Sequence, residues 1–223
     1  MIEKSLIICY STPNYETLAN ICLTSLYNIG VPKQNIIHKM DRPPQDLMKT
    51  TGFMTDLFYY CICHKVEHLI ETLRTYSNEY EYYISLDMDI WFIEKHPHLW
   101  VDLERYISQH PAVDVFFMRE NGTNDANGGF FIIKNDHIMD VIAWLQHIHD
   151  ELLQRPRSDL PMLEQQLINE TKHGIHHAFI PDDYVIWGNQ IHNHECALFH
   201  HAVCCYDTDS KLDQIKKIKE KMV

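Results

Sequence analysis

The order of hydrophobic and polar positions predicts strands that alternate with helices. Residues 6–10, Leu-Ile-Ile-Cys-Tyr, are continuously apolar, which is typical of a strand buried on both faces of a parallel sheet. Over residues 15–28 apolar side chains recur at helical spacing, and Gly30 follows as a helix stop. A second helix with its apolar face over 66–76 precedes another buried strand at 82–86.

The remainder of the chain continues this alternation. It predicts helices over 136–153 and 160–171 and short strands over 36–37, 113–118, 129–133, 176–180, 185–186 and 197–199. The alternation implies an α/β fold with a mainly parallel central sheet flanked by helices. Because hydrophobicity is spread evenly and no repeat or linker is visible, we expect a single domain over residues 1–223.

Composition and charge narrow the classes of function. With 45% hydrophobic and 22% charged residues, the chain is expected to fold. Its 19 basic and 31 acidic side chains give a net charge of −12, which argues against nucleic acid as a partner and requires a local cation for any anionic ligand. An odd number of cysteines and the lack of a membrane-length apolar run predict a soluble, cytoplasmic protein without an integral membrane segment.

A pair of carboxylates directly after the predicted strand 82–86 is the strongest chemical signal. Asp87 and Asp89 flank Met88, and the aromatic-rich run Ile90-Trp91-Phe92 follows. Two carboxylates at the carboxyl end of a buried strand can face one hard divalent cation, and oxygen ligands favour Mg²⁺ or Mn²⁺. Such a cation clamps a diphosphate and neutralises it as a leaving group. The alternative is a pair of surface acids in a loop.

Three further segments carry polar side chains near the ends of predicted elements. Residues 119–128 combine polar side chains with glycines, which let a ligand approach the backbone but also suit an ordinary turn. Glu164 and Gln165 could contact a sugar hydroxyl or a developing positive charge, or could form a solvated helix face. His200 and His201 follow a short apolar strand, and only one of them can share a face with the acids.

Together these motifs resemble those of the GT-A nucleotide-diphospho-sugar transferases, a superfamily of glycosyltransferases that includes compact virus-encoded members. The resemblance covers most of the chain and lies in residues 9–15, Asp87-Met88-Asp89, Asn127-Gly128-Gly129-Phe130, Glu164-Gln165 and the strand that ends in His201. It implies a single-domain GT-A (Rossmann-like) fold and metal-dependent hexosyl or deoxyhexosyl transfer. The donor would be a nucleotide-diphosphate sugar, with a UDP-sugar favoured, and the acceptor a hydroxyl on a glycan or glycoprotein.

The resemblance also implies roles for individual residues. Mn²⁺ or Mg²⁺ would be held by Asp89, by Asp87, which contacts the ribose or the metal, and by His201, with His200 in reserve. Ser11, Thr12 and Tyr15 would lie against the nucleoside, Lys65 near the nucleotide, Asn127 and Asp125 at the donor sugar, and Glu164 with Gln165 at the reacting centre. One departure is notable: many relatives carry a Gly and a Lys after the histidine, whereas here Cys204, Cys205 and Tyr206 precede Lys211.

The stereochemical course stays open at this level. If the sugar inverts, a carboxylate must take the proton of the acceptor hydroxyl, and Asp125 or Glu164 is the best candidate. If configuration is retained, Glu164 or Gln165 would stabilise the cationic centre from the opposite face.

A haloacid-dehalogenase-like phosphatase is an alternative enzyme. An apolar strand followed by Asp-x-Asp is also the signature of that family, in which Asp87 would be the nucleophile and Asp182-Asp183 the later acidic pair. Ile90-Trp91 replaces the usual Thr or Val, however, and the motif lies far from the start of the chain.

A zinc-binding module is a third interpretation, based on Cys61-Ile62-Cys63-His64 and Cys204-Cys205. Structural zinc sites prefer repeated cysteine pairs two to four residues apart, which these are not. The C-terminal stretch 211–223 is amphipathic and lysine-rich; such a helix could touch an acidic membrane surface, but more often packs on its own domain.

Overall fold

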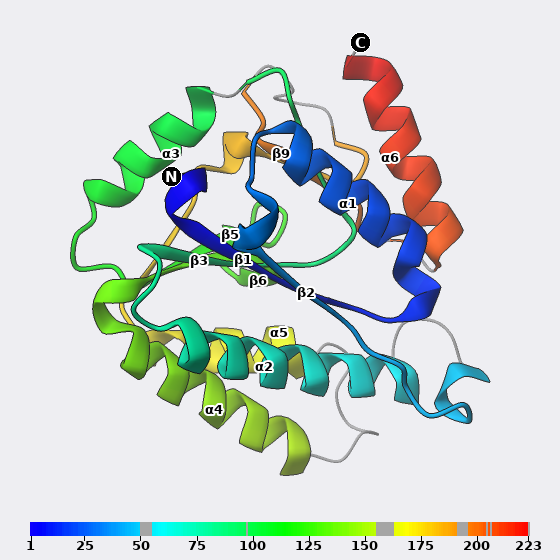
Figure 1. The fold of residues 1–223 in the computed structure, drawn as a ribbon, viewed down its shortest axis with the longest axis horizontal. Helices are drawn as coiled ribbons and strands as arrows, with labels where there is room; N and C mark the ends of the chain where they lie inside the picture. The colour runs from blue at the N-terminus through cyan, green and yellow to red at the C-terminus, as the bar shows by residue number, and fades with distance from the viewer. Residues whose placement is uncertain are drawn as a thin grey trace.

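A six-stranded mixed sheet lies at the centre of the protein (Figure 1). The computed structural model describes residues 1–49, 55–96, 98–154, 163–190, 196–203, 205 and 207–222. The sheet has the order β2-β1-β3-β6-β5-β7. Its strands are β1 (Ser5–Ser11), β2 (Ile36–Met40), β3 (Tyr82–Leu86), β5 (Val115–Arg119), β6 (Ala126–Lys134) and β7 (His177–Phe179).

The strand directions confirm the predicted α/β fold with a mainly parallel sheet, but one strand, β6, is antiparallel to its neighbours. All residues of β1 and β3 are buried, as their continuous apolar runs predict. Strand β1 pairs in parallel with β2 and β3, and β5 pairs in parallel with β7. Strand β6, however, runs antiparallel to both β3 and β5 and begins at Ala126 instead of residue 129. The segment Asn127 to Gly129 therefore belongs to a buried strand and not to a turn.

Helices cover both faces of this sheet. In Figure 1, α2 (Asp56–Tyr76), α4 (Ile138–Gln154) and α5 (Leu163–Thr171) lie on one side, and α1 (Glu16–Asn28), α3 (His98–Ser108) and α6 (Thr208–Met222) lie on the other. The first side buries Leu69 and Ile142 against Phe117, and the second buries Cys22 and Leu103 in the same core as Phe130. The predicted helix 160–171 is observed from Leu163, and residues 160–162 lie outside the described part.

A second, three-stranded sheet of order β4-β9-β8 was not predicted as a separate unit. It consists of β4 (Ile90–Phe92), β8 (Val185–Trp187) and β9 (Phe199–His201). The predicted strand 197–199 is thus shifted, so that both histidines are in β9 and His201 pairs opposite Ile90. The amide of Ala202 donates to the carbonyl of Asp89 at 3.0 Å. This small sheet therefore brings the C-terminal histidine to the Asp-x-Asp turn.

The C-terminal helix α6 packs on its own domain, the more common of the two arrangements considered above. Ile215 is buried with Leu18 and Ala202, and Ile218 is buried with Ile93. The position of the helix fixes Lys211 near the start of α6. Among the described residues, no helix combines the length and the apolar character needed to cross a membrane.

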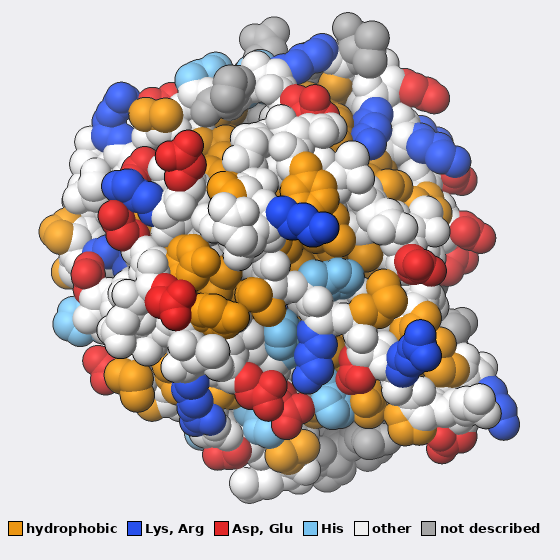
Figure 2. All heavy atoms as spheres, in the orientation of Figure 1, with side chains coloured by type: hydrophobic (Ala, Val, Ile, Leu, Met, Phe, Trp, Pro, Cys, Tyr) orange, Lys and Arg blue, Asp and Glu red, His pale blue; other side chains and the backbone are white. Residues whose placement is uncertain are grey.

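Histidine side chains gather in the middle of the face shown in Figure 2, over the region where Figure 1 shows β2 and α2. His68 on α2 is buried, and its Nε2 has no hydrogen-bond partner among the described residues. Burial lowers the pKa of His68, and it also lowers the pKa of the half-buried His38 on β2. Both imidazoles are therefore favoured in the neutral form in the folded state.

Acidification is expected to destabilise the protein through these histidines. An unfolded histidine has a pKa of about 6.5, so below that pH the unfolded chain binds more protons than the folded one and the free energy of unfolding falls. In urea unfolding at pH 7.5 and pH 5, His68→Gln should lose less stability than the wild type, by on the order of 1 kcal/mol. His137→Gln, at an exposed position, is the control. An identical pH dependence in His68→Gln and wild type would contradict the assignment.

Candidate functional site

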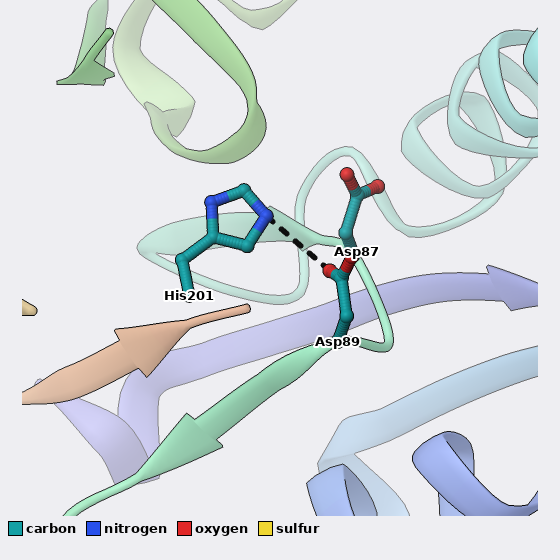
Figure 3. Close-up of side chains that lie close together, drawn as sticks. All are labelled: Asp87, Asp89 and His201. Carbon is teal, nitrogen blue, oxygen red and sulfur yellow. Dashed lines mark ion pairs between the residues drawn. The ribbon is translucent and has the colours of Figure 1, made fainter. Parts of the chain in front are cut away.

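Three potential metal ligands converge where β3 ends, β4 begins and β9 ends. Asp87 directly follows β3, Asp89 directly precedes β4, and His201 is the last residue of β9 (Figure 3). One ligand atom from each lies within 4.8 Å of the others. The amide of Asp87 donates to the carbonyl of Gly129 at 2.8 Å, which ties this turn to β6. Backbone pairing of both sheets thus sets the positions of the three side chains.

Asp89 is the buried centre of this group, with a side chain only 6% exposed. Nε2 of His201 lies 3.3 Å from its Oδ1, and the Lys211 ammonium donates to its Oδ2. Burial alone would raise the pKa of Asp89, but the charges of Lys211 and His201 outweigh it and hold this pKa well below its ordinary range. Oδ1 of Asp89 and Nδ1 of His201 have no hydrogen-bond partner among the described residues. The carboxylate stays ionised and keeps one oxygen available to a cation.

The donor set fits a divalent ion such as Mn²⁺, which accepts carboxylate oxygen and imidazole nitrogen together. The neighbouring Gly129 leaves room for the side chains of His201 and Asp87. A Cβ at this position would lie 2.6 Å from Cε1 of His201 and 3.0 Å from Oδ2 of Asp87. His200 faces elsewhere, with its Nε2 2.8 Å from the carbonyl of Gly188. Burial lowers the pKa of His200 to about 4. His201 is therefore the histidine that shares the site with the acids.

Lys65 on α2 lies between two carboxylates beside the metal-ligand group. Its Nζ lies 2.8 Å from Oδ1 of Asp87 and 3.2 Å from Oε1 of Glu164, and it donates to the carbonyl of Gly128 at 3.0 Å. Burial lowers the pKa of Lys65, but the two carboxylates outweigh this effect and raise the pKa above its usual range. Burial raises the pKa of Glu164, and Lys65 offsets only part of that rise. Glu164 and Asp87 thus share one ammonium group.

Gln165 and Asn127 shape the strand that borders the site. Oε1 of Gln165 accepts from the amide of Gly128 at 2.9 Å, and its Nε2 donates to the carbonyl of Ala126. Nδ2 of Asn127 donates to Oε2 of Glu120 at 2.6 Å. Both ends of the Gln165 amide are therefore used to hold β6. Glu120, which sequence reasoning did not single out, holds Asn127.

The residues expected at the nucleoside lie at the end of β1. Ser11 is buried, and its Oγ lies 2.7 Å from Nε2 of His38. The Thr12 hydroxyl donates to the side chain of Asn14. The ring of Tyr15 lies 5.4 Å from Nζ of Lys211, measured to the ring centroid. Tyr15 and Lys211 therefore connect the end of β1 with the metal-ligand group.

Lys211 enters the site from α6 although its sequence context departs from the family pattern. Its ammonium group pairs with Asp89 and lies beside Tyr15. Burial lowers the pKa of Lys211, whereas Asp89 raises it by more, so this lysine stays charged. A signal in the sequence could have found it: Lys211 precedes Ile215 and Ile218 by four and seven residues, which places it on the buried stripe of the helix.

Asp125 is placed differently from the other expected site residues. Its side chain is 60% exposed, and its carboxylate lies 3.9 Å from Nζ of Lys172. The contacts of the described residues do not bring it into the group formed by Lys65, Asp87 and Glu164. Of the two carboxylates considered for proton transfer, Glu164 is the one that shares an ion-pair partner, Lys65, with the metal-ligand group.

The cysteines do not form a metal cluster in the described part of the chain. There, Asp87, Asp89 and His201 are the one group of three potential ligands, and it contains no cysteine. Cys61 and Cys63 lie on α2, whereas Cys204 lies outside the described residues. The structure therefore gives no support to the zinc-binding interpretation.

A family model matches most of the chain. The family model described as "Nucleotide-diphospho-sugar transferase" matches residues 30–215. A glycosyltransferase involved in the glycosylation of the major capsid of PBCV-1 aligns with a TM-score of 0.65 and 13% identity, over 94% of this chain and 99% of that one. No curated protein matches.

Two further solved structures share the fold. The apo form of glycosyltransferase GlyE of Streptococcus pneumoniae TIGR4 aligns with a TM-score of 0.59 and 9% identity, over 99% of this chain and 64% of that one. Mouse xyloside xylosyltransferase 1 aligns with a TM-score of 0.51 and 11% identity, over 90% and 98%. At these sequence identities, the likeness to solved structures shows the fold alone. The family model covers most of the sequence, and its match argues against the haloacid-dehalogenase-like phosphatase. The chain belongs to the nucleotide-diphospho-sugar transferase family.

Proposed function

We propose that the protein is a metal-dependent glycosyltransferase that moves a sugar from a nucleotide-diphosphate donor, preferably a UDP-sugar, to a hydroxyl of a glycan. The observation that carries this proposal is the meeting of Asp87, Asp89 and His201 within 4.8 Å, flanked by the charged Lys65 and Lys211. Carboxylates and an imidazole suit a divalent ion, and two ammonium groups suit the anionic diphosphate that the family's donors carry.

The buried charges suggest how the chain would handle the leaving group. Asp87, Asp89 and His201 would hold a divalent ion, which would supply positive charge to a departing diphosphate. Lys211 on α6 and Lys65 on α2 would add two positive charges beside the ligand group. Because these lysines are already oriented by carboxylates, little reorganisation is needed when negative charge develops on the leaving group.

Glu164 is the proposed reacting-centre carboxylate. It is buried beside Lys65 and Gly128, and its raised pKa suits a group that accepts a proton. As an anion it would equally stabilise positive charge at the anomeric carbon in a retaining reaction. Gln165 would contribute by holding β6, as its two backbone hydrogen bonds require. Proton NMR of the freshly formed product reports the anomeric configuration and separates the two courses.

A thermal-shift panel of nucleoside diphosphates and nucleotide-sugars, with and without Mn²⁺, tests the proposal. A ligand that binds only the folded state stabilises it by about 2.7 kcal/mol at a hundred times its Kd. We expect UDP to raise the unfolding midpoint only when Mn²⁺ is present, and a UDP-sugar to be hydrolysed or transferred. Indifference to every nucleotide with and without the metal would refute the proposed function.

Replacing Lys211 should weaken nucleotide binding. Lys211→Met removes a half-buried ammonium next to the proposed diphosphate position, so the Kd of UDP with Mn²⁺ should rise about ten-fold or more. Lys216→Met is the matched control, because Lys216 is exposed on the same helix. Titration calorimetry measures both. Equal affinities in Lys211→Met and Lys216→Met would remove Lys211 from the proposed diphosphate site.

A further inference from the structure

A cavity of about 200 Å³ lies between β8 and the turn after β5. Its floor is apolar and consists of Ile180, Val185 and Trp187. Ile180 and Trp187 are buried, and Val185 is half-buried. Its exposed rim carries Asn121, Asp182 and Gln190, and Arg119 lines one side. An apolar floor with a few polar groups around it is the usual composition of a small-molecule site.

Trp187 connects this cavity with the proposed metal site. It pairs with His201 in the register of β8 and β9, and the two rings meet edge to face with centroids 5.4 Å apart. A molecule seated on Trp187 would therefore lie next to the histidine of the metal-ligand group.

The charges of the cavity lining cancel. Nε of Arg119 lies 3.2 Å from Oδ1 of Asp182, and its guanidinium stacks over the ring of Phe179 at 4.1 Å. Another guanidinium nitrogen donates to the side chain of Asn124 at 2.9 Å. Arg119 is thus paired and held in place, and the cavity lining carries no net charge, which suits an uncharged ligand.

A second cavity near Gln165 differs in its chemistry. It is lined by Glu120, Asp125, Glu170, Gln165, Gln166 and Asn169, so three carboxylates and no basic side chain face it. Of these two cavities, only the first is lined by apolar residues. Substitutions in the second cavity therefore serve as controls for substitutions in the first.

We propose that the cavity over Trp187 is the subsite for an uncharged saccharide acceptor. The apolar floor can pack against the carbon-bound hydrogens of a sugar ring, while the amides of Asn121 and Gln190 on the rim can reach its hydroxyls. This assignment rests on the proposed function, because it places the acceptor hydroxyl beside the metal-ligand group that would hold the donor.

Saturation-transfer NMR with a panel of methyl glycosides, in the absence of donor, tests the subsite directly. We expect at least one glycoside to bind the wild type, and Asn121→Ala and Gln190→Ala to raise its Kd about five-fold each through loss of a hydrogen bond. Gln166→Ala, which removes the same amide from the second cavity, should leave this Kd unchanged. No binding by any glycoside, or weakening in Gln166→Ala instead of Gln190→Ala, would overturn the proposal.

Transfer assays with the nucleotide-sugar chosen by the thermal-shift panel complete the test. The KM of the saccharide acceptor should rise in Asn121→Ala and Gln190→Ala, whereas the KM of the donor should change less than two-fold. A glycoside that binds at this cavity but never accepts sugar while the donor is turned over would overturn the acceptor assignment. Transfer to a peptide hydroxyl with which no glycoside competes would do the same. Failure of the proposed function would appear separately, as indifference to every nucleotide in the thermal-shift panel.

Discussion

Asp89→Asn is expected to reduce the rate of sugar transfer about 10³-fold while the protein remains folded. The substitution keeps the shape of the side chain but removes a negative charge that lies between His201 and Lys211. Its carboxylate is the more deeply buried of the two in the proposed ligand group, with a side chain 6% exposed against 37% for Asp87. Transfer rates and the affinity for Mn²⁺, measured by titration calorimetry, should fall together.

Folding of this variant needs its own measurement, because Lys211 loses its buried partner. Leaving one charge of a buried pair unpaired costs about 3 kcal/mol, so the melting temperature should fall although circular dichroism stays native. Asp209→Asn, at an exposed position on α6, is the matched control and should change neither rate nor stability. A folded Asp89→Asn protein that keeps the wild-type rate and Mn²⁺ dependence would contradict the role of Asp89.

Gly129→Ala should lower activity about 100-fold by displacing the ligands without changing their chemistry. The added Cβ would lie 2.6 Å from Cε1 of His201 and 2.8 Å from Oδ1 of Asn127, and real Cβ atoms do not approach other atoms that closely. Either the histidine must move away from Asp89 or β6 must shift. The affinity for Mn²⁺ and the transfer rate report the loss.

Gly174→Ala provides the comparison for this substitution. A Cβ at Gly174 meets no atom within 4 Å, so its rate and melting temperature should stay close to those of the wild type. If Gly129→Ala binds Mn²⁺ as tightly as Gly174→Ala does, the tight packing at Gly129 does not define the site.

The hydrophobic pattern of a short segment predicts those strands and helices whose burial does not depend on distant parts of the chain. The apolar runs that become β1 and β3 are buried on both faces in any α/β sheet, so their identity and their neighbouring carboxylates could be derived from the sequence. The direction of β6 could not, because a fully buried strand has the same pattern in parallel and antiparallel pairings. Helix α3 was not predicted, although Leu99, Leu103 and Ile107 have helical spacing.

Some residues of the candidate site can likewise be predicted from a single segment, whereas others depend on contacts between distant segments. Asp87 and Asp89 follow from one strand and one turn, whereas the pairing of His201 with Ile90 depends on a second sheet assembled from distant segments. Lys211 reaches the site through the packing of a whole helix, which the sequence around the histidine does not reveal. Gln165 was expected at the reacting centre, but its amide binds the backbone of β6 at both ends, a contact between α5 and β6 that no local pattern indicates.

The position of the bound ion tests the central claim most directly. Crystals grown with MnCl₂ and UDP can be measured at the manganese absorption edge, where anomalous scattering locates the metal independently of any model of the protein. The account predicts one strong peak in contact with Asp87, Asp89 and His201 and adjacent to the diphosphate. A peak at other residues, or bound UDP with no manganese at these three side chains, would contradict it.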